Sequence, residues 1–176
     1  MLIMHDLFKI YSDLQRFDNF IKTQLKEKYK CSEVNWDDAW QYVRPPFPIP
    51  QTIDHKPENM APLVHDNLTE LSMKILECYS LYNFYISLLK KFSETKEKIV
   101  RSANPLNVTS VTSECRAEML LTGESLSDIN DVRSSIYSLS EMGNQASTTK
   151  LIIMELISIL NDSYQHEIKV SFKLPN

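Results

Sequence analysis

The chain has 176 residues, 43% of them hydrophobic, which is enough for one folded domain with a real core and argues against disorder throughout. Only two glycines are present, and because phosphate-binding loops, oxyanion loops and tight βα turns depend on glycine, few such sites can be built. Lysine and arginine total 19 against 23 aspartates and glutamates, with both signs scattered, so the concentrated basic face that a nucleic-acid binder needs is absent.

The first predicted elements are two helices. Apolar residues in the segment 7–29 recur at intervals of three and four, which places them on one stripe of a helix. Asn35 then precedes an acidic turn and suits the N-cap of a second, short helix that runs to about Val43. That helix would place Trp36, Trp40 and Val43 on one side. Core packing and partner binding are both open for the two tryptophans, because this residue type is enriched at binding hot spots.

Residues 45–62 are predicted to form a proline-rich extended connector. Proline removes a backbone donor and restrains the residue before it to extended conformations, so neither a helix nor a central strand can run through this stretch. Polyproline II geometry is expected for the segment 44–50. Its apolar Phe47 and Ile49 favour a strap that lies on a surface over a free linker. The prolines of the connector are Pro45, Pro46, Pro48, Pro50, Pro57 and Pro62.

The strongest pattern is the heptad spacing that begins at Val64 and predicts a coiled-coil seam or a long bundle helix. The seam positions are Val64, Leu68, Leu71, Ile75, Cys78, Tyr82, Tyr85, Leu89, Phe92, Lys96 and Ile99, of which Lys96 alone is not apolar. The lysines around Lys96 alternate with glutamates, which is typical of a solvated helix face. A helix over 63–102 would have about 40 residues and a length of roughly 60 Å. Three partners could cover this long helix: helix one together with the strap, a second copy of the chain, or a different subunit.

Further helices are expected after a Ser/Thr-rich loop. A short helix over 114–122 would close at Gly123, and the capping box at 125–128 would open the next one, which ends at Gly143. The last helix, over 148–163, is apolar on almost every side, so we expect it to be nearly surrounded by protein. A strand over the apolar part of that segment is the alternative.

The chain closes with a strand-like segment. Ile168, Val170, Phe172 and Leu174 alternate with polar residues, and this period of two predicts a half-buried strand. A single strand cannot satisfy its backbone hydrogen bonds within a helical bundle. We therefore expect it to pair with another strand, preferably across an interface by β-augmentation.

Recognisable catalytic or metal-binding motifs are missing. The four histidines are dispersed, and the three cysteines are far apart and odd in number, which indicates neither a zinc site nor a disulfide framework. Cys78 falls in the apolar seam, where burial would make its thiol inert. The acidic Asp6 interrupts the first apolar stretch, so a secretory signal is not expected. We expect an intracellular protein, nuclear or cytoplasmic, without catalytic residues, cofactor, metal or small-molecule substrate.

The predicted fold is mainly α. It is an elongated helical bundle with one long, coiled-coil-like helix of about 40 residues, a proline-rich strap and a C-terminal β-strand. All segments are expected to form one structural domain. They are the N-terminal helices (1–44), the connector (45–62), the long helix (63–102), the C-terminal helices (103–166) and the strand (167–176).

The predicted function is binding of other proteins. We expect a non-enzymatic subunit or adaptor of a larger assembly, hetero-oligomeric more readily than homodimeric, with no direct contact to nucleic acid or membrane. The long-helix seam and the C-terminal strand are its expected contact surfaces. The alternative is a compact regulatory or viral helical effector that holds an amphipathic peptide helix in a groove. The candidate protein-binding residues are Trp36, Trp40, Phe47, Ile49, Ile168, Val170, Phe172 and Leu174.

Overall fold

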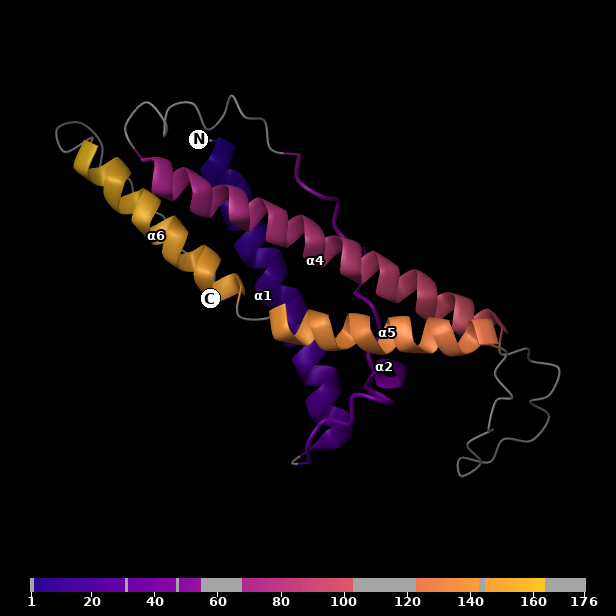
Figure 1. Ribbon diagram of the computed structural model, residues 1–176. Helices are drawn as coiled ribbons and strands as arrows, with labels where there is room; N and C mark the ends of the chain where they lie inside the picture. Colours follow the sequence, from indigo (N-terminus) through magenta and orange to yellow (C-terminus); the bar gives the residue numbers. More distant parts are fainter. Residues whose placement is uncertain are drawn as a thin grey trace.

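The computed structural model describes residues 2–30, 32–46, 48–54, 68–102, 123–142 and 145–163, and within these ranges the protein is helical and has no strand (Figure 1). The prediction of a mainly α bundle is therefore confirmed at this level. The helices are α1 (Leu2–Tyr29), α2 (Ala39–Tyr42), α4 (Thr69–Ser102), α5 (Gly123–Glu141) and α6 (Gln145–Ser163).

Helix α4 is the central element, and α5 and α6 follow one another along it in the opposite direction (Figure 1). Lys98 near the end of α4 pairs with Asp128 near the start of α5, at 2.7 Å. Lys74 near the start of α4 lies 3.5 Å from Glu155 in the second half of α6. The remaining long side of α4 is crossed by α1, which also packs against α5 and α6. The seam of α4 is thus enclosed by helices of its own chain.

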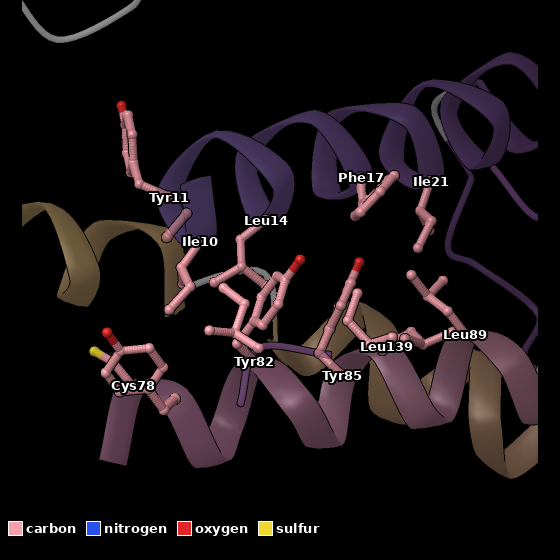
Figure 2. Packing of buried hydrophobic residues seen from close by; sticks show 14 of the residues in the cluster. Ile10, Tyr11, Leu14, Phe17, Ile21, Cys78, Tyr82, Tyr85, Leu89 and Leu139 are labelled. Atoms are coloured by element: carbon pink, nitrogen blue, oxygen red, sulfur yellow. The ribbon is translucent and has the colours of Figure 1, made fainter. Parts of the chain in front are cut away.

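The centre of the core is the crossing of α1 over α4. The apolar stripe predicted for α1 is buried along the helix, and it begins earlier than expected because Met4 continues it toward Leu2. Phe17 stacks against Tyr85 with ring centroids 6.3 Å apart. Figure 2 shows the two stripes facing each other, with Ile10, Leu14, Phe17 and Ile21 on α1 and Tyr82, Tyr85 and Leu89 on α4.

Two tyrosine–aspartate hydrogen bonds fix how α1 lies across α4. The hydroxyl of Tyr79 donates to Asp6 at 2.9 Å, and the hydroxyl of Tyr82 donates to Asp13 at 2.7 Å. Burial, followed by these hydrogen bonds, raises the pKa of both tyrosines. Since apolar side chains alone tolerate small shifts along a helix, these directional bonds specify one register. Tyr85 is buried as well, but its hydroxyl has no hydrogen-bond partner among the described residues.

The long helix is shorter than predicted. It begins at Thr69 and has 34 residues, about 51 Å at the usual rise, whereas the heptad spacing suggested about 40 residues from position 63 onward. Leu68 is not helical, and its carbonyl accepts the first helical hydrogen bond from Ser72. Glu70 provides the negative charge that suits a helix N-terminus. The spacing of apolar residues therefore did not predict the start of the helix, because periodicity carries no information about where a helix is capped.

The seam was also expected to be a contact surface for partners, and this is wrong for the described chain. From Leu71 to Ile99 the seam residues other than Lys96 are buried against α1, α5 and α6. Of the three covers left open by the sequence, helix one is observed, and α5 and α6, which the prediction did not name as cover, complete the enclosure. Phe84, outside the seam, is 54% exposed and does not share the burial of its tyrosine neighbours.

The C-terminal helices differ from the prediction in two ways. Helix α5 begins at Gly123, so this glycine opens a helix instead of closing one, and the 125–128 capping box lies inside the first turns. Helix α6 excludes the strand alternative, but it is not nearly surrounded by protein, since Leu151 is 66% and Met154 is 53% exposed. Its inner face packs against α1 and α4, whereas the face that carries Leu151 and Met154 has no cover among the described residues.

The predicted strand over 167–176 and the whole of the expected 114–122 helix lie outside the described residues. No strand occurs in the part of the chain that the structure describes, so the strand of the predicted fold is not supported. Within the same residues, no helix is long and apolar enough to cross a membrane.

Candidate protein-binding surface

Helix α2 is a single turn that side chains of other elements hold in place. Asn35 prepares the turn, because its side-chain oxygen accepts from the Asp37 backbone at 3.1 Å and its carbonyl accepts from Ala39 at 3.0 Å. The N-cap prediction for Asn35 is wrong, because residues 36–38 form a turn and the helix begins at Ala39 with Asp38 as its N-cap. Arg133 of α5 donates to the Asp37 carbonyl at 2.8 Å. These bonds tie the short helix to the bundle on its N-terminal side.

Lys96 caps the C-terminal end of α2. Its ammonium donates to three backbone carbonyls, those of Trp40 at 2.7 Å, Gln41 at 3.0 Å and Val43 at 2.7 Å. Carbonyls at a helix C-terminus lack partners within the helix and carry partial negative charge, so a cation stabilises them. Burial, followed by repulsion from Arg44, lowers the pKa of Lys96 to about 8. The polar exception in the seam is therefore a structural cation, and the solvated face expected for it is wrong.

The strap after α2 is fastened by amide side chains. Asn83 of α4 accepts from the Ile53 backbone at 2.8 Å and donates back to the Ile53 carbonyl at 2.9 Å. Gln24 of α1 accepts from the backbone of Arg44 at 2.8 Å and donates to its carbonyl at 3.4 Å. Each amide imitates the paired hydrogen bonds of a neighbouring strand. Pro46 and Ile53 are buried, so the described part of the connector (45–46 and 48–54) lies on the bundle, and the rest of the predicted strap lies outside the described residues.

A hollow of about 890 Å³ opens between the second half of α1 and this fastened segment (α2 to Arg44), in a region where α2 lies close to α1 (Figure 1). We call it the α1–α2 groove. Three aromatic rings, Phe17, Phe20 and Tyr42, supply its apolar lining, and Phe20 is 39% exposed. Its charged and polar lining consists of Arg16, Lys28, Arg44, Glu27, Asn19, Thr23 and Gln24.

The cations of the α1–α2 groove lie over aromatic rings. The Lys28 ammonium is 3.9 Å from the centre of the Tyr42 ring, and the Arg16 guanidinium is 5.1 Å from that of Phe17. Such contacts hold a cation near an apolar surface while leaving its hydrogen-bond donors free for another group. The groove therefore combines exposed aromatic area with positive charge.

The sequence-predicted contact residues are not gathered at this groove. Trp40 is buried, and its indole N–H has no hydrogen-bond partner among the described residues. Trp36 is half-buried and packs edge-on against Tyr137 of α5, with centroids 5.3 Å apart. Ile49 packs against the core. These placements favour the packing interpretation, and a role for Trp36, Trp40 and Ile49 in binding stays a prediction.

The other predicted contacts, Phe47 together with Ile168, Val170, Phe172 and Leu174, lie outside the described residues, so their role also stays a prediction. Sequence reasoning missed Phe20, Tyr42 and the three groove cations. One signal was available: Arg16, Phe20 and Lys28 stand at helical spacing beside the buried stripe of α1, outside the residues that the core needs. Tyr42 and Arg44 could not be found, because only the fold of the connector brings them to α1.

Other chemistry is sparse in the described part of the chain. No cluster there unites three or more histidine, cysteine, aspartate or glutamate side chains in a way that could hold a metal ion. Cys78 is buried, and burial raises the pKa of its thiol, as the seam position predicted. A second hollow, of about 540 Å³, lies between α4 and α6 beside this thiol and is edged by the exposed Leu151.

Comparison with known proteins provides no relative: no family model, no curated protein and no solved structure matches the chain.

Proposed function

We propose that the protein is a non-enzymatic protein-binding module, a subunit or adaptor of a larger assembly, that holds a segment of a partner protein in the α1–α2 groove. The observation that supports the proposal best is the lining of this groove, where the partly exposed rings of Phe20 and Tyr42 lie beside three cations on segments that the bundle holds in place. Aromatic and arginine side chains dominate the energetics of protein interfaces. The groove is preformed, so a partner would meet little ordering cost on this side.

The geometry favours the groove-binding mode over docking on the long-helix seam. The seam of α4 is already enclosed by the chain's own helices, whereas the α1–α2 groove is open. An open hollow whose lining runs along α1 from Arg16 to Lys28 suits an extended or helical peptide segment.

The outer face of α6 is a second candidate contact surface. Leu151 and Met154 are both largely exposed although α6 is the most apolar helix of the chain. Exposed apolar residues that lie together on one helix are typical of a surface that a partner covers. A module with two separate contact surfaces would act as an adaptor.

Site-specific photo-crosslinking tests the proposal. A photoreactive phenylalanine analogue at Phe20 is expected to crosslink a partner protein in cells of the source organism, and the same analogue at the more exposed Phe84 serves as the matched control. The captured partner is then purified and its affinity for the chain is measured. Phe20→Ser should weaken it by about tenfold or more, as expected for a hot-spot aromatic, and Phe84→Ser should not. Equal effects of the two variants would contradict the proposed site.

A further inference from the structure

Resting on the proposed function, we infer that the partner segment held in the α1–α2 groove is acidic and carries an aromatic or large aliphatic anchor residue. The anchor would lie against Phe20 and Tyr42, and the carboxylates of the segment would meet Arg16, Lys28 and Arg44.

The first support is that the groove cations lack carboxylate partners. Among the described residues, no aspartate or glutamate forms an ion pair with Arg16, Lys28 or Arg44. Elsewhere in the bundle, cations such as Lys91 and Lys98 reach a carboxylate of another helix. Exposed lysines elsewhere, such as Lys9 and Lys90, also lack an ion pair among the described residues, and the groove differs from them in gathering three such cations in one lining.

The second support is that ring contacts hold the charges of two of these cations and hydrogen bonds hold the backbone of the third. The Lys28 ammonium rests on the Tyr42 ring, and the Arg16 guanidinium rests over Phe17, so both charges stay at the edge of the apolar lining. The backbone of Arg44 is clamped by Gln24. A ligand that places one apolar side chain between carboxylates matches this arrangement, because the rings attract the anchor and the cations attract the charges around it.

The third support comes from Lys96, behind the groove. Repulsion from Arg44 is among the causes that lower the pKa of Lys96. Positive charge therefore accumulates on this side of the protein, and an acidic ligand would relieve the repulsion. Nucleic acid fits less well, since three cations offer few phosphate contacts.

Binding of defined probes to the full chain tests the inference. Fluorescein-labelled peptides of equal length are compared by fluorescence anisotropy: one with a central phenylalanine and leucine between glutamates, one with the same anchors between lysines, and one with serines in place of the anchors. A labelled DNA duplex is the fourth probe. The acidic, anchored peptide is expected to bind at least about tenfold more tightly than each other probe, and less tightly as salt rises.

Charge reversal provides the decisive variant. Arg16→Glu with Arg44→Glu should weaken the acidic peptide about tenfold and strengthen the lysine peptide, whereas Lys9→Glu with Lys90→Glu, two exposed cations outside the groove, should change neither. Circular dichroism checks that both double variants fold.

The outcomes separate this inference from the proposed function. If the lysine peptide binds the wild type as well as the acidic one, and Phe20→Ser weakens both, the groove binds peptides but the acidic partner is wrong. If Phe20→Ser changes the affinity for no peptide, the groove is not the binding site and both conclusions fail. If the DNA duplex binds more tightly than the acidic peptide, the cations serve phosphates and the inference is overturned.

Discussion

The crossing of α1 over α4 and the fastening of α2 with its strap use opposite kinds of interaction. At the crossing, apolar side chains of both helices bury one another, and the two tyrosine–aspartate bonds join side chain to side chain. At α2 and the strap, single side chains of the bundle hold backbone groups, as Lys96, Asn83 and Gln24 do. The crossing makes the bundle stable, and the fastening places the outer wall of the α1–α2 groove.

The largest effect is expected at the crossing, from Leu89→Asp. Leu89 is 1% exposed in the seam, so the variant would bury an unpaired charge and lose packing, at a cost of roughly 3 kcal/mol or more. That is a large share of the stability of an ordinary domain. Thermal melting followed by circular dichroism measures it, with Leu89→Ala as a milder variant and the exposed neighbour Lys90→Asp as control. Melting of Leu89→Asp within a degree or two of wild type would mean that the seam is not buried.

A smaller and more local effect is expected at the fastening, from Lys96→Met. The variant keeps the aliphatic stem but leaves two carbonyls of α2 and that of its C-cap Val43 without the lysine donor, which should cost about 2 kcal/mol at most. Hydrogen exchange should accelerate in the residues around α2 and stay unchanged in α1 and α4. The exposed Lys90→Met is the control. Equal acceleration throughout the bundle would show that α2 and the core open together.

The same lysine predicts a pH dependence. Its pKa is lowered to about 8 in the folded protein and stands near 10.5 when unfolded, so between these values the folded state binds fewer protons. The free energy of unfolding should therefore rise with pH in this window, relative to Lys96→Met. The comparison is best made below about pH 9.5, because tyrosines ionise above it. A difference between the two proteins that is constant from pH 7 to 9.5 would contradict the burial of this charge.

The sequence predicted the crossing of α1 and α4 better than it predicted the fastening of α2 and the strap. The spacing of Leu14, Phe17, Ile21 and their counterparts on α4 predicted the crossing helices, because burial of an apolar stripe leaves a periodic trace. The fastening leaves no such trace, since one lysine or one asparagine at the right place is enough. Lys96 was visible only as the exception in the seam. The α1–α2 groove depends on where the connector lies, and periodicity does not determine that.

A further local effect of about 1 kcal/mol is expected from Asn83→Ala, which removes both hydrogen bonds to Ile53. Asn83→Asp is the informative partner variant, because it keeps the acceptor for the Ile53 amide and loses the donor to its carbonyl. Backbone amide exchange at Ile53 should be fast in Asn83→Ala and partly protected in Asn83→Asp. Protection of Ile53 that is unchanged in both variants would mean that Asn83 does not hold the strap.

The smallest effects are expected from a matched pair of tyrosines at the crossing. Tyr82→Phe removes the donor to Asp13 and leaves that carboxylate partly buried, which should cost about 1 kcal/mol. Tyr85→Phe, one turn further along α4, removes a buried hydroxyl that has no partner among the described residues. Because a buried hydroxyl without a hydrogen bond is itself destabilising, this variant should be as stable as wild type or more so. Both variants remove one hydroxyl oxygen, so comparing their free energies of unfolding in denaturant cancels the effect of the smaller side chain. If both lose the same stability, the hydrogen bond to Asp13 adds nothing and packing alone sets the register of α1 on α4; if Tyr82→Phe alone is weakened, the directional bond contributes to that register.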